Sequence, residues 1–220
     1  AFISLALTAC SKQESSSASV IPPTASAPAP QPVADSTDKA TVSIANGPFG
    51  LAQGMTLAQI GGKPEKVAPG IWRLASVPKP HSAFEEYIVQ IGPISGLCWI
   101  KGIGKTIKTS AYGSEVRSHF TDLKERLSTN YGKSKDIDRL LSGSIWNDPR
   151  DWMMALLKKE RFLLSVWDHE SGATLNSDLK SVGLVASALG TEEAFISVEY
   201  SFSNEDKCEA EIKKEEDGAL

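Results

Sequence analysis

The chain has 220 residues, with 23 Lys or Arg against 27 Asp or Glu, which gives a formal net charge of −4. This balance excludes a strongly basic nucleic-acid-binding protein, because neutralising phosphates requires a concentrated basic surface. Hydrophobic residues make up 41% of the chain, which is enough to build a core. No uninterrupted apolar run reaches the roughly 18 residues that a membrane-spanning helix needs.

The first ten residues are a short apolar stretch that ends in Leu7-Thr8-Ala9-Cys10. Such a stretch is typical of the hydrophobic region of a secretory signal; the other interpretation is a fragment of a core helix with an incidental cysteine. The last four residues resemble the bacterial lipobox, in which the cysteine thiol is lipidated and the chain is cleaved just before it. The resemblance implies that residues 1–9 are a signal peptide remnant. It also implies that Cys10 carries a diacylglycerol and an N-acyl chain such as palmitate, and multiple acyl chains anchor a protein stably.

Residues 10–44 are predicted to be a lipid anchor followed by a disordered linker. Between Ser11 and Asp38, seven Ser, five Ala and five Pro make up 17 of 28 residues. Such a segment cannot bury enough apolar surface to offset its ordering entropy. By the lipoprotein resemblance, Ser11 after the cysteine favours the outer membrane over the inner one.

Residues 45–220 are predicted to form a globular α+β body, an antiparallel sheet packed with helices. A short helix is expected within residues 54–60, with Thr56 as its N-cap and Gly61-Gly62 as its end. Strands are expected next, over residues 71–74, 87–91, 97–100 and 105–109.

The clearest helix is predicted over Ser114–Tyr131, because five apolar residues fall at spacings of three or four: Val116, Phe120, Leu123, Leu127 and Tyr131. Ser114 is the expected N-cap, and Gly132 the expected left-handed C-terminal residue. A second helix is predicted to start at Pro149 with Asp148 as its cap. Strands are then expected over residues 162–167, 179–189 and 195–202, followed by a charged helix over residues 205–217.

The body contains a recurring order of elements. A helix ending at Gly62-Lys63-Pro64 precedes Trp72 and a strand, and a helix ending at Gly132-Lys133-Ser134 precedes Trp146 and a strand, with an offset of about 70–75 residues. One interpretation is a tandem duplication of a helix-then-strands unit, with copies at about 48–110 and 111–203. The other is chance, because this order is common in α+β proteins.

Three short segments carry a family resemblance: Phe49-Gly50-Leu51, Gly54-Met55-Thr56 and Gly62-Lys63-Pro64. Together they resemble the helix entry of SmpA/OmlA-type outer-membrane lipoproteins and of the related tandem-repeat β-lactamase inhibitor fold. The resemblance covers about 16 residues, and the expected helix is shorter than the family pattern. It implies a layered α+β fold.

Few segments of the chain are candidates for a phosphate-binding or metal-binding site. Gly102-Ile103-Gly104-Lys105-Thr106 ends like a phosphate-binding loop, but Trp99 stands where that loop needs a glycine, so a turn is expected. Asp168-His169-Glu170 is expected to be a solvated turn, because neighbouring strand residues point to opposite faces and cannot share one ion. We therefore expect no metal site and no cofactor.

The other histidines, His81 and His119, are far apart in sequence and accompany no Gly-x-Ser-x-Gly motif. No catalytic residue and no enzymatic activity are therefore predicted. The tryptophans are interpreted as core residues, because four of them lie inside predicted elements: Trp99, Trp146, Trp152 and Trp167.

With Cys10 lipidated, two thiols remain, Cys98 and Cys208. The periplasm is an oxidising compartment, so a disulfide between them is predicted. The alternative is a buried Cys98 that acts as a small hydrophobe and an exposed Cys208.

Taken together, the sequence predicts a lipoprotein of the bacterial cell envelope, anchored to a membrane through Cys10, with its body in the periplasm. The expected role is non-enzymatic: binding, assembly or inhibition, with another envelope protein as partner. The alternative is a lipid-anchored hydrolase acting on an envelope polymer. A cleft with an acid and a base in hydrogen-bond reach would favour the hydrolase, whereas a broad, shallow sheet face would favour binding.

Overall fold

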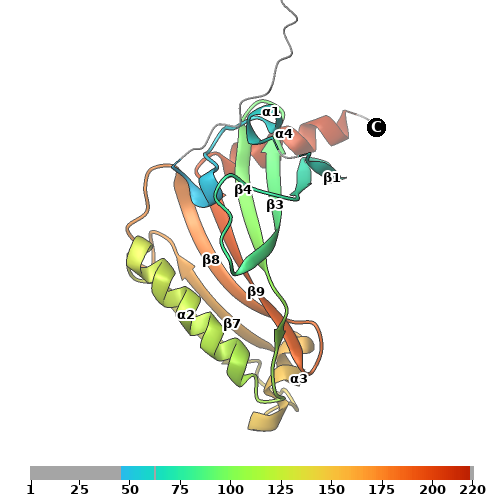
Figure 1. The fold of residues 1–220 in the computed structure, drawn as a ribbon, viewed down its shortest axis with the longest axis vertical. Helices are drawn as coiled ribbons and strands as arrows, with labels where there is room; N and C mark the ends of the chain where they lie inside the picture. Colours follow the sequence, from blue (N-terminus) through green and yellow to red (C-terminus); the bar gives the residue numbers. More distant parts are fainter. Residues whose placement is uncertain (1–45, 62, 219–220) are drawn as a thin grey trace, which may run out of the picture. The chain divides into compact units, whose positions relative to one another are not determined.

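The computed structural model describes residues 46–61 and 63–218. The signal remnant, Cys10 and the linker predicted over residues 1–44 lie outside the described residues. The described chain has an α+β fold, a nine-stranded antiparallel sheet with four α-helices packed against it, which confirms the predicted fold class (Figure 1).

The sheet consists of two meanders that meet in its middle. The first contains β1 (Glu65–Ala68), β2 (Ile71–Leu74), β3 (Phe84–Gly92) and β4 (Gly96–Gly104), and the second contains β6 (Lys135–Leu140), β7 (Arg161–Trp167), β8 (Leu179–Ala188) and β9 (Glu193–Phe202). The strand order is β1-β2-β3-β4-β9-β8-β7-β6, and the short β5 (Ile107–Lys108) pairs with β9 beyond the end of β4. The last strands of the two meanders therefore lie side by side. This is the order that two copies of one unit would give, and the duplication stays a prediction.

The helices differ greatly in length. The 3-10 helix η1 (Pro48–Gly50) and the one-turn α1 (Leu57–Ile60) precede the first meander, and the long α2 (Ser114–Tyr131) precedes the second. Between β6 and β7 lie η2 (Pro149–Asp151) and α3 (Trp152–Leu157), and α4 (Glu205–Asp217) follows β9. The predicted bounds of α2 and α4 are confirmed.

The predicted N-caps of these helices are observed, with one exception. The Thr56 N–H donates to Oε1 of Gln59 at 2.8 Å, and Oδ1 of Asp148 accepts from the Arg150 N–H at 2.9 Å. The N-cap of α2, however, is Gly113 and not the predicted Ser114. Gly113 has a φ of +66° and lies against the Trp152 ring, so no side chain fits there.

The main core lies between α2 and one face of the sheet, and Figure 1 shows α2 running along β8 and β9. Val116 and Phe120 of α2 are buried, and three further members of the predicted stripe pack against the core: Leu123, Leu127 and Tyr131. The indole N–H of Trp167 donates to the Gly132 carbonyl at 3.1 Å, which joins β7 to the end of α2.

The glycine-rich segment after Trp99 is not the predicted turn. Gly102 and Gly104 lie inside β4, and a Cβ atom at Gly102 would lie 2.9 Å from the Phe49 ring. The prediction was wrong because the glycines do not bend the chain there: Gly102 provides room for an aromatic ring on the sheet, and Gly104 for the Ile196 carbonyl of the neighbouring strand.

α4 packs on the opposite face of the sheet, over β3 and β4. The register of β3 and β4 shifts at Gln90, so that Cys98 is an extra residue between Leu97 and Trp99. Leu97 consequently belongs to the main core, whereas Cys98 belongs to a separate buried cluster with Cys208 and Ile212 of α4. The Cys98–Cys208 disulfide is present, with 6.3 Å between the two Cα atoms, which confirms the predicted pairing.

A carboxylate on α4 also holds the turn between β3 and β4. Oε2 of Glu211 accepts hydrogen bonds from the Ser95 N–H at 2.8 Å, the Ile94 N–H at 3.1 Å and the Ser95 hydroxyl at 2.7 Å. The hydrogen bond from the Ser95 N–H is the main reason why the pKa of Glu211 lies below the ordinary value of 4.5.

A Glu211→Gln variant is therefore expected to be less stable than the parent protein at neutral pH. A carboxyl group whose pKa is depressed on folding stabilises the protein above its unfolded pKa, and this contribution is lost as the pH falls through the folded pKa. The difference in unfolding free energy between parent and variant should thus be largest near pH 7 and shrink below the ordinary value of 4.5. Urea denaturation at several pH values measures it, with the exposed Glu209→Gln as control. A difference that grows on acidification would contradict this assignment.

Candidate interaction surfaces

The sheet has a face with little helical cover. Strand pairing places Ile137, Leu164 and Val185 next to one another across β6, β7 and β8, on the side opposite α2. Nine apolar residues on this side are half-buried, and none belongs to the main core. They define the open face: Ile88, Trp99, Ile103, Ile137, Phe162, Leu164, Val166, Val185 and Phe195.

Two ion pairs lie on the open face. Lys101 on β4 and Glu199 on β9 are direct cross-strand neighbours and form an ion pair at 2.8 Å. Nearer the β1 edge, Arg73 contacts Glu86 at 2.6 Å. These ion pairs lie on the half of the face nearer β1. On the other half, β7 presents Phe162, Leu164 and Val166, and the edge strand β6 presents Ile137 between the two cations Lys135 and Arg139.

The structure divides the predicted core tryptophans into two groups. Trp152 and Trp167 are buried, as predicted. Trp99 lies on the open face and Trp146 in the segment between β6 and η2, and both are half-buried. The interpretation of Trp99 and Trp146 as core residues was wrong. Trp99 belongs to a continuous apolar run on β4, and such a run does not show which of its side chains face the helices. Trp146 lies outside the helices and strands.

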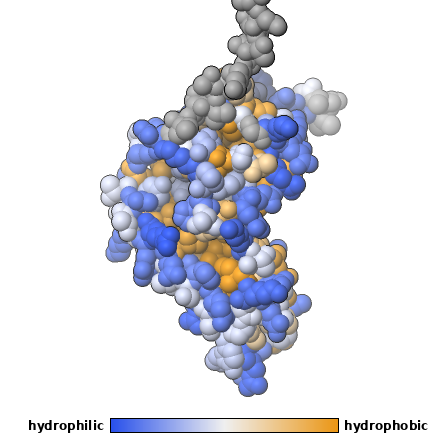
Figure 2. Space-filling model, in the orientation of Figure 1, coloured by the Kyte–Doolittle hydropathy of each residue, from blue (hydrophilic) through white to orange (hydrophobic). Residues whose placement is uncertain are grey.

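A second surface is the α2 groove, which lies between α2, β5 and the loop that precedes β3. Two cavities of about 490 and 300 Å³ share His81, Leu123 and Arg126 and thus form one groove. Its floor is apolar and includes Phe49, Phe84, Ile107, Leu123, Ile196, Val198 and Tyr200. Its rim carries Lys79, Lys105, Lys108 and Arg126 together with Glu115 and Asp122. Figure 2 shows hydrophobic side chains in the middle of this view, with hydrophilic ones around them.

The titratable groups of the groove do not form a catalytic pair. Nδ1 of His81 accepts from the Ala83 N–H at 3.1 Å, and Oε2 of Glu115 accepts from the Thr109 hydroxyl at 2.6 Å. Within residues 46–61 and 63–218, no histidine hydrogen-bonds to a carboxylate. Burial raises the pKa of the Tyr200 phenol, which therefore stays protonated.

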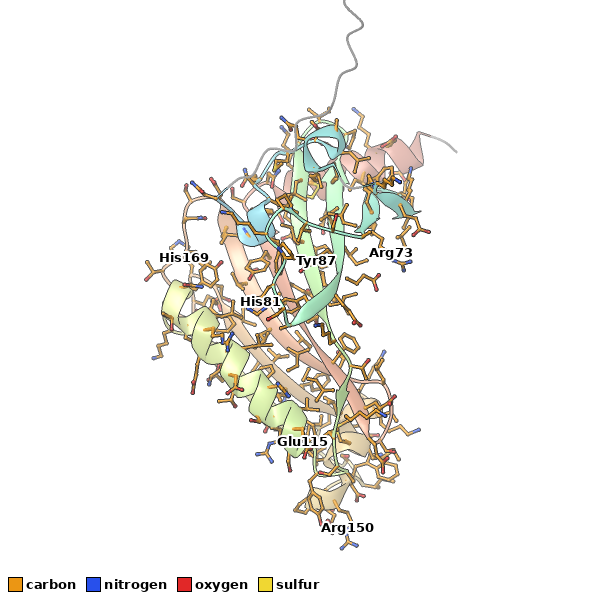
Figure 3. The ribbon with its side chains drawn as sticks, in the orientation of Figure 1. Arg73, His81, Tyr87, Glu115, Arg150 and His169 are labelled. Carbon is orange, nitrogen blue, oxygen red and sulfur yellow. A yellow bond between two sulfur atoms is a disulfide. The ribbon has the colours of Figure 1, made fainter. Side chains whose placement is uncertain are left out.

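The remaining predicted candidates lie apart. His169 belongs to an exposed turn near the end of α2, whereas Glu115 is in the first turn of that helix (Figure 3). Oδ1 of Asp168 accepts from the Ser171 N–H at 2.7 Å, so Asp168 serves the turn itself. The described part of the chain contains no cluster of three or more potential metal ligands. Nor does it contain a helix long and apolar enough to cross a bilayer.

The fold and its surfaces define an α+β protein with a disulfide-linked C-terminal helix, an open sheet face and a groove. No family model, no curated protein and no solved structure matches the chain.

Proposed function

We propose that this protein is a non-enzymatic binding module of the bacterial cell envelope, anchored through a lipid on Cys10, and that its open face binds another envelope protein. The sequence features of the first 38 residues support the anchor and the compartment. The Cys98–Cys208 disulfide is consistent with that compartment, because disulfides persist in oxidising environments.

The open face is the observation that carries the binding role. Half-buried apolar groups on neighbouring strands, such as Leu164, Val166 and Val185, form a contiguous surface that water contacts in the free protein. Contiguous apolar surface of this kind is typical of protein–protein interaction sites. The shallow shape of a sheet face favours a macromolecular partner over a small substrate.

Site-specific photo-crosslinking in intact cells tests this role. A photoreactive amino acid at position 164, on the open face, should give a discrete adduct with one partner protein. The same group at position 118, an exposed position on α2, should not. Changing Val166 to Glu should reduce the adduct yield about tenfold or more, because the interface would have to bury an unpaired charge.

The matched control for Val166→Glu is Thr121→Glu, which adds the same charge at an exposed position on α2. Thermal unfolding verifies that both variants fold. Equal adducts from positions 164 and 118, or no adduct from position 164, would refute the open face as the binding surface.

Lipid anchorage has its own test. Cys10→Ser removes the thiol that the lipid requires, so the variant is expected to move from the membrane fraction to the soluble periplasm. Fractionation followed by immunoblotting measures the change, and Cys208→Ser serves as a control that keeps Cys10. A Cys10→Ser protein that stays fully membrane-bound would contradict the anchor.

A further inference from the structure

β5 has a free edge beside the α2 groove. β3 begins at Phe84, which pairs with Gly104 at the end of β4. β5 continues along β9 after this point, but its only strand neighbour among the described residues is β9. The cavity of about 490 Å³ lies there, lined by Gly104–Lys108, by His81–Ala83 just before β3, and by α2. The Ala83 carbonyl accepts from the Lys105 N–H at 3.1 Å, so the groove continues the line of β3 beyond Ala83, beside residues 106–108.

The backbone of β5 presents hydrogen-bonding groups to this free edge. The Thr109 N–H donates to the Glu192 carbonyl at 2.9 Å, and Lys108 lies opposite Glu193 in the same register. In an antiparallel ladder, hydrogen-bonded and non-hydrogen-bonded pairs alternate. The N–H and C=O of Lys108 therefore point away from β9, where a further strand could pair with them.

The rim of the groove beside β5 favours acidic groups. Lys105, Lys108 and Arg126 are exposed, and none of them forms an ion pair within the described part of the chain. With Lys79, four cationic side chains line the rim of the groove, against the two acidic residues Glu115 and Asp122. The rim is therefore net positive on a chain whose net charge is −4.

The floor beneath these cations is apolar. Ile196 is 2% exposed, and Ile107 and Leu123 are half-buried. Side chains of an added strand would alternate between this floor and the outer side.

We propose that the α2 groove binds an extended peptide segment of alternating apolar and acidic residues, which pairs with the free edge of β5 as an additional strand. Its apolar side chains lie over Leu123 and Ile196, and its carboxylates lie near Lys105, Lys108 and Arg126. Strand addition at a sheet edge obtains affinity from main-chain hydrogen bonds and specificity from alternate side chains. This site is separate from the open face, so the outcome of its test does not depend on the proposed function.

The probe is a fluorescein-labelled seven-residue peptide of alternating Glu and Leu, titrated with the protein and followed by fluorescence anisotropy. Saturable binding is expected. The double variant Lys105→Glu/Lys108→Glu should weaken binding about tenfold, since each lost ion pair is replaced by a like-charge contact. Lys213→Glu/Lys214→Glu, which makes the same charge change on exposed positions of α4, should leave it unchanged.

Two further peptides separate strand addition from charge attraction alone. A version with N-methylated amides at alternate positions keeps every charge but loses main-chain donors, and it should not bind. A version with Lys in place of Glu should not bind either. In the complex with the Glu–Leu peptide, amide hydrogen exchange of Lys108 should slow at least tenfold.

Equal binding of the N-methylated peptide, or equal affinity of the two double variants, would overturn the proposal. Failure of the Glu–Leu peptide to bind, with binding of a fatty acid at the same site, would also overturn it, because the occupant would then be a lipid. Circular dichroism and thermal unfolding establish that each variant is folded.

Discussion

Replacing both Cys98 and Cys208 with Ala is expected to lower the free energy of unfolding by about 2–5 kcal/mol. The disulfide joins residues that are 110 positions apart, and a cross-link over such a long loop restricts the unfolded chain strongly. Both cysteines are fully buried, so the variant also loses contacts around the sulfur atoms. Urea denaturation of the parent and the variant measures the change.

The loss of stability should appear first in α4. This helix buries only Cys208 and Ile212 against the sheet, and its other links are polar, such as Glu211 with Ser95 and Asn204 with the carbonyls of Ser95 and Leu97. Amide hydrogen exchange should therefore accelerate in α4 well before it accelerates in β9. Unchanged stability, or uniform acceleration throughout the body, would contradict the role of the disulfide as the anchor of α4.

The sequence predicts those elements whose apolar residues recur with a clear period. α2 was predictable because its stripe from Val116 to Tyr131 has helical spacing, and Gly132 ends it with a φ of +78°. α4 was predictable from charge and spacing although it buries little. In both cases local chemistry and tertiary position agree.

Two strands were not predicted, and both lie at the edges of the sheet. All four residues of β1 are exposed, and β6 reads Lys-Asp-Ile-Asp-Arg-Leu with four charged side chains. Edge strands are held mainly by backbone pairing, and charged side chains protect them against further pairing. No apolar alternation exists in such segments, so the periodicity of the sequence gives no indication of a strand.

The open face and the α2 groove both depend on how elements far apart in the sequence are arranged in the fold. The residues Phe162-Leu163-Leu164 of β7 form one apolar run, but Leu163 packs against the core and its neighbours belong to the open face. Only the placement of α2 on one side distinguishes them. The bulge at Cys98 likewise decides which face that cysteine occupies, and cysteine counting predicted the pairing without it.

Because the side chains of β7 are divided between the core and the open face, their truncation should change the free energy of unfolding by different amounts. Trp167 is 0% exposed and its indole N–H donates to the Gly132 carbonyl, so Trp167→Ala is expected to lower the free energy of unfolding by about 3–5 kcal/mol. Trp167→Phe keeps most of the ring but loses the hydrogen bond, and it should cost about 1–2 kcal/mol.

The matched control is Leu164→Ala on the same strand. Leu164 lies on the open face and is half-buried in the free protein, so its truncation should cost only about 1 kcal/mol. Chemical denaturation of the three variants gives the order directly. A loss at Leu164 as large as the loss at Trp167 would mean that the open face is covered in the free protein, and the surface proposed for partner binding would not exist.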